Sequence, residues 1–344
     1  MATITVLAID GGGIRGLIPA AFLNRLEQET EHCISDLFDY ISGTSTGGIL
    51  ALGLGLKRPN QAKPYTAAEL SSLYTAEGGR IFSRSLLHRI GALENLNGPK
   101  YPEDGVDEVL RKYFAGMRLR DARTNVLVTA YAIELRCPFF FRSWQAQATE
   151  TSLTHDFEAW QVARSTSAAP TYFPPNQAQA ADGRTYALID GGMYANNPAL
   201  CAWVEAHDRH PGADILVVSL GTGNENKKVR YDAAKNWGLI GWAPRLIDVI
   251  FDGVSDTVDV ELDEMLNTGG RQNHFRFQTD IQGAQQDMDD TNDVNLQSLK
   301  ALGEKLASGA AFEEVSTRLG AVLAERTALG QPVPLPPAIP RNVA

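Results

Sequence analysis

A serine between two glycines is the pattern in this chain with the clearest chemical potential, because Gly43, Ser45 and Gly47 form G-x-S-x-G. The apolar residues 37–41 before it are typical of a strand end, and residues 49–54 after it are rich in helix formers. In a strand–turn–helix context this motif is a nucleophile elbow, whose tight turn excludes Cβ atoms at both flanking positions. The pattern predicts Ser45 as a nucleophile at a helix N-terminus, supported by both glycines; a chance Gly/Ser turn is the alternative.

A nucleophilic serine needs a base, and an aspartate suits this role better than any of the six histidines. No histidine follows an obvious strand, and His274 is at best a loop candidate. Asp190 ends an apolar segment, and Gly191 and Gly192 behind it would let the backbone approach Ser45 closely. Because burial raises the basicity of a carboxylate, Asp190 can act directly as a general base. The alternative is an aspartate that caps a turn, a common role in Asp-Gly sequences.

A glycine-rich loop lies between a β-branched segment at residues 3–9 and a predicted helix near residues 19–31. Its G-x-G-x-x-G pattern, Gly11 to Gly16, raises the alternative of a nucleotide-binding regulator. A dinucleotide site would need an acidic residue at the end of a second strand, and none stands there. We therefore favour an oxyanion hole made by backbone N–H groups, with a positive charge nearby. The residues predicted for it are Gly11, Gly12, Gly13 and Arg15.

Four ordered blocks resemble the patatin family, lipid acyl hydrolases related to the catalytic domain of cytosolic phospholipase A2. The blocks are Asp10-Gly-Gly-Gly-Ile-Arg-Gly16, Gly43-Thr-Ser-Thr-Gly-Gly48, Ser165-Thr-Ser-Ala-Ala-Pro-Thr-Tyr-Phe-Pro-Pro175 and Asp190-Gly-Gly192. The resemblance extends over most of residues 3–300.

The resemblance implies a Ser–Asp dyad in which Ser45 attacks a fatty-acyl ester and Asp190 activates first the serine and then water. It implies a lipid or phospholipid substrate at a membrane surface, no cofactor and no metal. Gly16, Gly191 and Gly192 would support the site. Some bacterial members are antiphage effectors switched on by cyclic dinucleotides, so an activator of that kind stays open. Acyl transfer to an acceptor other than water also stays open.

The bulk composition of the 344 residues argues against several classes of protein. The net charge of −10 argues against a nucleic-acid polymer as partner, since such binders carry a basic face. The three cysteines are scattered, and the sequence lacks both a basic-then-apolar leader and a long apolar run. We therefore expect a cytoplasmic protein without a transmembrane segment. It should associate only transiently with membrane surfaces. The acidic cluster at residues 287–293 lacks the spacing of a calcium loop and indicates a solvated helix N-terminus.

We expect one α/β domain over residues 1–325, with a mostly parallel sheet covered by helices on both faces, and a Pro-rich, poorly ordered tail at 326–344. Residues 57–105 should form an excursion over the active-site face, outside the core, with a helix near 67–76. Trp237 and Trp242 are expected to pack on the core, the alternative being a lip that dips into lipid. Residues 139–141 are expected in a buried strand, the alternative being an acyl groove.

The predicted strands are 3–9, 126–133, 139–143, 186–190 and 215–220, the last of them the final buried strand. Helices should dominate residues 244–325.

Overall fold

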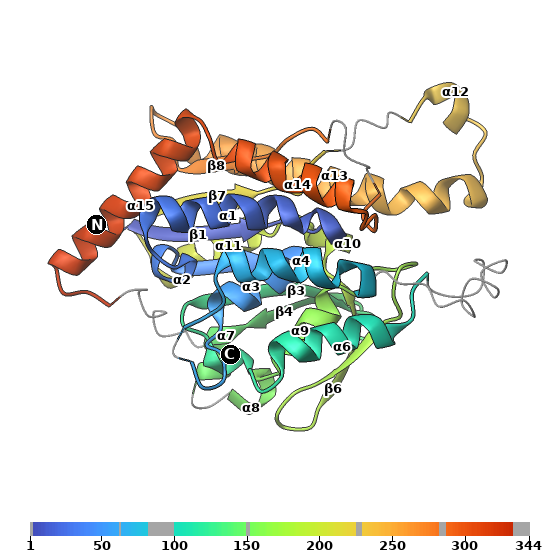
Figure 1. The fold of residues 1–344 in the computed structure, drawn as a ribbon, viewed down its shortest axis with the longest axis horizontal. Coiled ribbons are helices and arrows are strands. Elements are labelled where there is room, and N and C mark those ends of the chain that lie inside the picture. Colours follow the sequence, from blue (N-terminus) through green and yellow to red (C-terminus); the bar gives the residue numbers. More distant parts are fainter. Residues whose placement is uncertain are drawn as a thin grey trace.

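The computed structural model describes residues 3–61, 63–81, 100–148, 152–224, 229–281 and 287–332 (Figure 1). One sheet of eight strands runs through it in the order β5-β6-β3-β2-β1-β7-β8, with β4 paired to β3. β1 pairs in parallel with β2 and β7, and parallel pairing continues from β2 to β3 and from β7 to β8. The β3–β4, β3–β6 and β5–β6 pairs are antiparallel. The strands are β1 Thr3–Ile9, β2 Tyr40–Gly43, β3 Asn125–Ala132, β4 Cys137–Arg142, β5 Asn176–Gln179, β6 Thr185–Asp190, β7 Asp214–Leu220 and β8 His274–Phe277.

Helices cover both faces of this sheet, so the predicted α/β fold with a mostly parallel sheet is confirmed. Side chains alternate along β1: Leu7 and Ile9 join the larger core, while Val6 and Ala8 join the smaller one. The larger core lies under α1 Leu17–Thr30, α3 Thr46–Gly55, α4 Ala67–Ile81, α6 Glu103–Phe114, α9 Ala159–Thr166, α14 Asp293–Leu306 and α15 Ala310–Ala328. The smaller core lies under α11 Ala199–Arg209 and α13 Leu239–Leu266. Shorter helices are η1 Gly13–Gly16, α2 Ile34–Leu37, η3 Leu119–Asp121, α7 Ser143–Gln147, α8 Ser152–His155, α10 Gly192–Ala195 and α12 Tyr231–Ala234.

The segment after α3 is more deeply packed than the sequence indicated. α4 covers the predicted helix near 67–76 but lies against α1, and its Leu70 and Leu73 are buried. The expectation that this part of the chain stays outside the core is therefore wrong for α4, because its apolar side chains find α1 as a partner. Residues 82–99 of the same segment lie outside the described residues.

The strand β8 was missed by the sequence analysis, which placed His274 in a loop and took residues 215–220 as the last buried strand. β8 pairs in parallel with β7, and its Phe275 and Phe277 are buried in the larger core. The sequence signal is weak because only four residues form the strand and polar residues flank it. Tertiary pairing with β7 creates this strand.

The two tryptophans before and within α13 do not pack on a core as expected. Trp242 is exposed and Trp237 is half-buried, and neither belongs to the two hydrophobic clusters of the described residues. The sequence could not show this, because the aromatic side chains pack on each other instead of on the sheet.

The C-terminal helix α15 continues to Ala328, past the expected domain boundary at 325. Arg326 on its last turn is buried and bonds to Asp39. Residues 333–344, which make up most of the expected tail, lie outside the described residues.

Candidate active site

Ser45 occupies a sharp turn between β2 and α3. Its backbone is in a strained left-handed conformation, with φ 54° and ψ −122°, which L residues adopt rarely. A Cβ on Gly43 would lie 2.0 Å from the carbonyl oxygen of Gly47, and one on Gly47 would lie 2.1 Å from that of Ile9. The Ser45 N–H donates to Thr166 Oγ1 at 2.8 Å, which fixes the turn from α9. The two glycines are therefore required by the close approach of three backbone segments.

Asp190 is fully buried at the end of β6. Its Oδ1 accepts the N–H of Gly192 at 2.8 Å, while Oδ2 is buried without a hydrogen-bond partner of standard geometry among the described residues. Burial raises the pKa of Asp190 to about 7, and hydrogen bonding from Gly192 and from the Ser45 hydroxyl lowers it only in part. The Ser45 hydroxyl is thus close enough to the carboxylate to influence its pKa.

Strand register brings the two residues together from positions far apart in the sequence. Gly43 pairs with Val128 on β3, and Asp190 pairs with Ala130 on the same strand, so both strands end at nearly the same level. Gly191 lies against β3, since a Cβ there would be 2.1 Å from Thr129 Oγ1. Gly191 therefore allows the turn after Asp190 to approach β3, whereas the sequence predicted an approach to Ser45.

The glycine loop after β1 has two backbone donors left for a ligand. Gly11 N–H donates to the carbonyl of Asn196 at 3.1 Å, and Ile14 N–H donates to that of Met288 at 2.8 Å. Within the described part of the chain, no acceptor binds the N–H of Gly12 or Gly13. Gly12 and Gly13 line the same cavity as Ser45 and Asp190, whereas Gly11 does not. The amides of Gly12 and Gly13 are therefore the two N–H groups of this loop that remain available to a ligand in the cavity.

Arg15 lies behind this loop. Its Nε donates to the carbonyl of Gly12 at 3.4 Å, and its side chain lines a separate, polar cavity with Asp10 and Asn196. Arg15 therefore acts on the loop through the Gly12 carbonyl and not as a wall of the Ser45 cavity. Gly16 allows a further close approach, because a Cβ there would lie 2.2 Å from Thr46 Oγ1.

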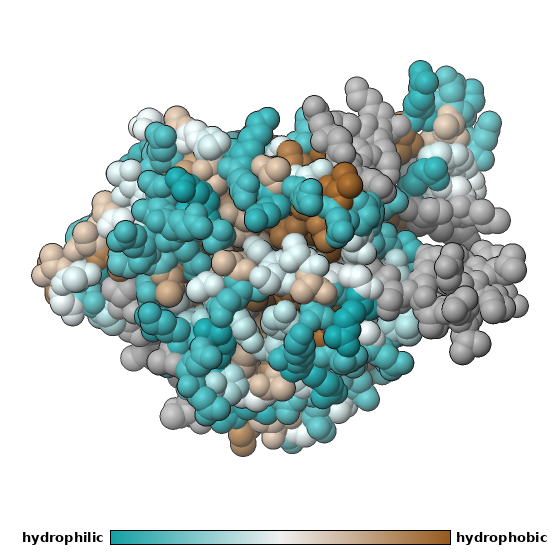
Figure 2. Space-filling model, viewed as in Figure 1, coloured by the Kyte–Doolittle hydropathy of each residue, from teal (hydrophilic) through white to brown (hydrophobic). Residues whose placement is uncertain are grey.

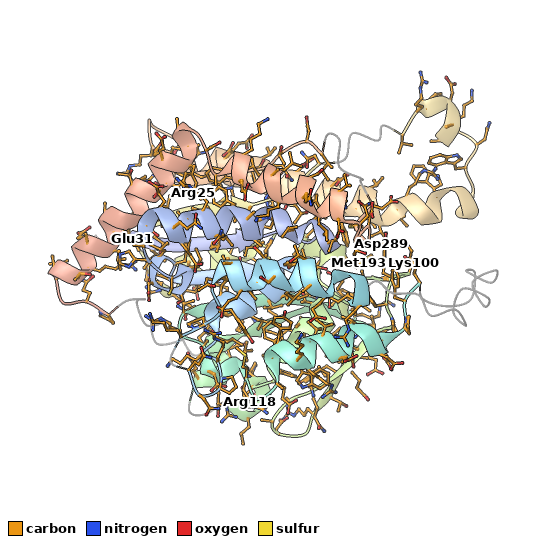
Figure 3. The ribbon with its side chains drawn as sticks, viewed as in Figure 1. Arg25, Glu31, Lys100, Arg118, Met193 and Asp289 are labelled. Carbon is orange, nitrogen blue, oxygen red and sulfur yellow. The ribbon has the colours of Figure 1, made fainter. Side chains whose placement is uncertain are left out.

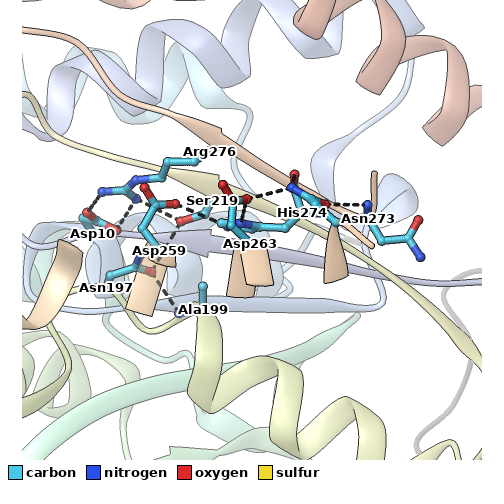
Figure 4. Close-up of polar contacts among 10 residues, drawn as sticks. Asp10, Asn197, Ala199, Ser219, Asp259, Asp263, Asn273, His274 and Arg276 are labelled. Carbon is cyan, nitrogen blue, oxygen red and sulfur yellow. Dashed lines mark hydrogen bonds and ion pairs between the residues drawn. The ribbon is translucent and has the colours of Figure 1, made fainter. Parts of the chain in front are cut away.

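The loop is tied to the sheet by a buried ion pair. Arg276 on β8 bonds to both carboxylate oxygens of Asp10, at 2.9 and 2.6 Å, and also to Ser219 Oγ at 2.9 Å (Figure 4). Burial raises the pKa of the Asp10 carboxyl, and the guanidinium of Arg276 opposes that shift. β8 thus anchors the residue that begins the glycine loop.

Four residues that the sequence analysis did not single out for the site hold its backbone. Thr166 Oγ1 accepts the Ser45 N–H, and the Ala168 carbonyl accepts the Asp190 N–H at 3.1 Å, so the third sequence block bridges nucleophile and base. Thr222 Oγ1 donates to the Gly11 carbonyl at 2.7 Å, and Asn196 O holds the Gly11 amide. Their sequence signals are weak: Thr166 and Ala168 lie in the third sequence block, Asn196 follows the Asp190 block, and Thr222 lies between two glycines.

The segment that carries Met288 is also held in place. Asp289 accepts a hydrogen bond from Tyr101 Oη at 2.5 Å. Its carboxylate also forms an ion pair with Lys100, and Figure 3 labels both residues. Asn292 caps α14 by accepting the N–H of Asn295 at 2.9 Å. The expectation of a solvated acidic cluster is therefore wrong for Asp289, whose side chain is largely buried.

The cavity around Ser45 and Asp190 is otherwise apolar. Its walls come from α3, α4, α6, α13 and the third sequence block, and they suit an acyl chain. The apolar and aromatic residues in the walls are Ile14, Ile49, Leu73, Tyr74, Ile81, Val106, Ala169, Tyr172, Phe173, Ile247, Phe251 and Met288. Of residues 139–141, which were expected in a buried strand, only Phe141 is buried; Phe139 and Phe140 are half-buried, and none of the three lines this cavity.

None of the histidines in the described ranges lines the cavity. His274 is buried on β8 and its Nδ1 lies 2.9 Å from Asp263 Oδ1, on α13 (Figure 4). His88 lies outside the described residues. Among the residues that the structure describes, no cluster of three or more His, Cys, Asp or Glu side chains could hold a metal ion.

Comparison with known proteins decides the family. Residues 7–203 match the family described as "Patatin-like phospholipase". "Patatin-like protein 2" of Oryza sativa subsp. indica is 32% identical, with 88% of this chain and 83% of that protein covered. The chain belongs to the patatin-like phospholipase family. "Patatin-like protein 2" of Arabidopsis thaliana is 31% identical, with 88% and 82% covered.

Membership of the patatin-like phospholipase family confirms the resemblance read from the sequence and the expected enzyme class, a lipid acyl hydrolase. VipD from Legionella pneumophila shows a weaker structural likeness, with a TM-score of 0.41 and 13% identity over 92% of this chain and 66% of that one. Across the helices that the structure describes, none combines the length and apolar character needed to cross a bilayer.

The close packing of the glycine loop means that a side chain at Gly12 should disturb the site. A Cβ at Gly12 would lie 2.3 Å from Thr222 Oγ1, so Gly12→Ala must displace either the loop or Thr222, which follows β7. We expect Gly12→Ala to lower kcat on a short-chain ester by about 10²- to 10³-fold, the usual effect of losing one oxyanion donor. Gly79→Ala is the matched control, because a Cβ there meets nothing within 4 Å. Equal rates for both variants would contradict the oxyanion assignment.

Proposed function

We propose that this patatin-like lipid acyl hydrolase cleaves fatty-acyl esters of glycerolipids through an acyl-enzyme on Ser45, with Asp190 as the base. The observation that carries the proposal is the buried Asp190 oxygen without a standard partner, in the same apolar cavity as the Ser45 hydroxyl. An unpartnered buried carboxylate oxygen is costly and is found where it has a chemical task.

In the first half of the reaction, Ser45 Oγ attacks the ester carbonyl carbon while Asp190 takes the hydroxyl proton. The carbonyl oxygen becomes an oxyanion, which the N–H groups of Gly12 and Gly13 stabilise. The C–O bond to the glycerol side then breaks, and Asp190 returns the proton to the leaving alkoxide. The fatty acyl group remains esterified to Ser45.

In the second half, water attacks the acyl-enzyme and gives one proton to Asp190. The Ser45 ester bond breaks, the proton returns to Ser45 Oγ, and a fatty acid leaves. The membrane surface supplies the substrate, and the apolar cavity walls take up its acyl chain.

The products of a mixed lipid extract, analysed by mass spectrometry, test this proposal. We expect free fatty acid and lysolipid or deacylated lipid, and a fluorophosphonate should label Ser45. Acyl esters of an added alcohol, formed in preference to fatty acid, would favour the acyltransferase alternative. Absence of both labelling and hydrolysis, with calorimetric binding of a dinucleotide, would favour the regulator alternative.

The proposed base predicts a pH dependence. Asp190 must be ionised to accept a proton, and its pKa is raised to about 7, so kcat/KM should rise as the pH passes through this value and level off above it. The measurement is the pH profile of kcat/KM on a soluble short-chain ester. A profile that stays flat across pH 7 would contradict the assignment of Asp190 as the ionising group.

A further inference from the structure

The helix α12 and the first turns of α13 project from the body of the protein at one end (Figure 1). This part of the chain exposes large apolar side chains at a density unusual for a surface facing water. Tyr231 is 79% exposed, Leu246 48%, Val249 46% and Trp242 37%. In Figure 2, which has the view of Figure 1, brown apolar residues surrounded by hydrophilic ones lie where α14 runs, beside the projecting end.

The apolar residues of α13 form a stripe. Trp242, Leu246 and Val249 are spaced four and three residues apart, so they share one side of the helix. Ile247 and Phe251 lie on the opposite side and line the Ser45 cavity. A Cβ on Gly192 would lie 2.6 Å from the Phe251 ring, so Phe251 packs directly beside the Asp190 turn. One helix therefore presents an exposed apolar stripe on one side and closes the catalytic cavity on the other.

The tip before this stripe is organised by its own aromatic contacts. Trp237 and Trp242 meet edge to face with ring centroids 5.3 Å apart, and the Arg245 guanidinium lies 4.5 Å from the Trp237 ring centre. Tryptophan and arginine of this kind are typical of the polar–apolar boundary of a bilayer. A rigid pair of rings can enter that boundary with little loss of side-chain freedom.

Positive and negative side chains lie in different parts of α12 and α13. The described part of this segment from Val229 to Ile247 carries exposed Arg230, Lys235 and Arg245 against a single exposed acid, Asp232, in a chain of net charge −10. The following part of α13 is acidic, with Asp248, Asp252, Asp256, Asp259, Glu261, Asp263 and Glu264. An anionic surface would attract the tip and repel the far half of the helix, and this fixes the orientation of docking.

We propose that Tyr231, Trp242, Leu246 and Val249, flanked by Lys235 and Arg245, form a docking surface for anionic lipid bilayers. Docking places α13 at the lipid source, and the opposite side of this same helix closes the Ser45 cavity. This inference deepens the proposed function, on which it rests for the identity of the substrate surface.

The test is co-sedimentation of the full chain with vesicles of ether-linked phospholipids, which an ester hydrolase cannot consume. We compare ether-linked phosphatidylcholine alone with the same lipid mixed with ether-linked phosphatidylglycerol. The wild-type protein should bind the anionic vesicles more tightly. The double variant Trp242→Ser/Leu246→Ser should lose at least about tenfold in vesicle affinity, because two large apolar groups no longer enter the interface. Lys235→Gln and Arg245→Gln should each lose about fivefold on anionic vesicles only.

Val260→Ser is the matched control, since Val260 is 58% exposed on the acidic half of the same helix. It should bind vesicles like the wild type. All these variants should hydrolyse a soluble short-chain ester at the wild-type rate, which shows that they fold and that the dyad is intact. Wild-type binding by Trp242→Ser/Leu246→Ser, or no vesicle binding by the wild-type protein, would overturn the docking surface. Failure of the wild type to hydrolyse any ester would instead overturn the proposed function.

Discussion

Replacing Asp190 by asparagine is expected to lower esterase activity by about 10³-fold or more, and Ser45→Ala should have an effect at least as large. An amide cannot take the serine proton, and among the described residues that line the Ser45 cavity Asp190 is the only carboxylate and no histidine is present. Hydrolysis of a soluble short-chain ester measures kcat for each purified variant, and fluorophosphonate labelling reports on Ser45 separately. Labelling should disappear in Ser45→Ala and become very slow in Asp190→Asn.

The fold of Asp190→Asn should survive, because the substitution removes a carboxylate that is costly to bury when ionised. The raised pKa means that folded Asp190 holds a proton between pH 3.8, the ordinary pKa of the group, and about pH 7, where the unfolded state has lost it. The stability of the wild type therefore falls as pH rises through this window, and Asp190→Asn should not show that fall. His274→Ala is the activity control, because His274 bonds to Asp263 away from the cavity. Full activity in Asp190→Asn together with loss in His274→Ala would point to a triad.

Replacing Arg326 by alanine is expected to lower the free energy of unfolding by about 3–5 kcal/mol, since it leaves the Asp39 carboxylate buried without its cation. Arg326 reaches both Asp39 oxygens, at 2.8 and 2.5 Å, and its Nη2 also donates to the Thr3 carbonyl at 2.6 Å. Asp39 additionally accepts the N–H of Thr5 at 2.9 Å, so the pair fastens α15 to the amino end of β1. Urea unfolding followed by circular dichroism measures the change.

An exposed ion pair provides the comparison for this prediction. Arg25→Ala breaks a surface contact between Arg25 and Glu29, both about half exposed, and should cost about 0.5 kcal/mol or less. The double variant Asp39→Asn/Arg326→Met removes both buried charges and should recover much of the stability lost in Arg326→Ala. If Arg326→Ala lowers the free energy of unfolding by less than about 1 kcal/mol, the end of α15 does not stabilise the sheet. That result would agree with a domain that ends at residue 325.

The elbow and the overall fold could be predicted from the sequence because their signals are local. Gly43 and Gly47 have to be glycines where a strand turns this tightly into a helix, because the carbonyls of Gly47 and Ile9 leave no room for a Cβ at these positions. The long apolar strands and the helices α1, α14 and α15 carry their own periodicity. Asp190 could be chosen over the histidines because a strand end and two glycines mark it.

Tertiary structure alone decided which of the candidate groups are available for chemistry. The three loop glycines are equivalent in the sequence, yet the Asn196 carbonyl occupies the Gly11 amide and leaves those of Gly12 and Gly13. Burial decided the pKa of Asp190, and pairing with β7 turned the polar segment around His274 into a strand. The exposed position of Trp242 followed from α13 projecting beyond the sheet. Each of these outcomes depends on a partner far away in the chain, and no local pattern of residues encodes such a partner.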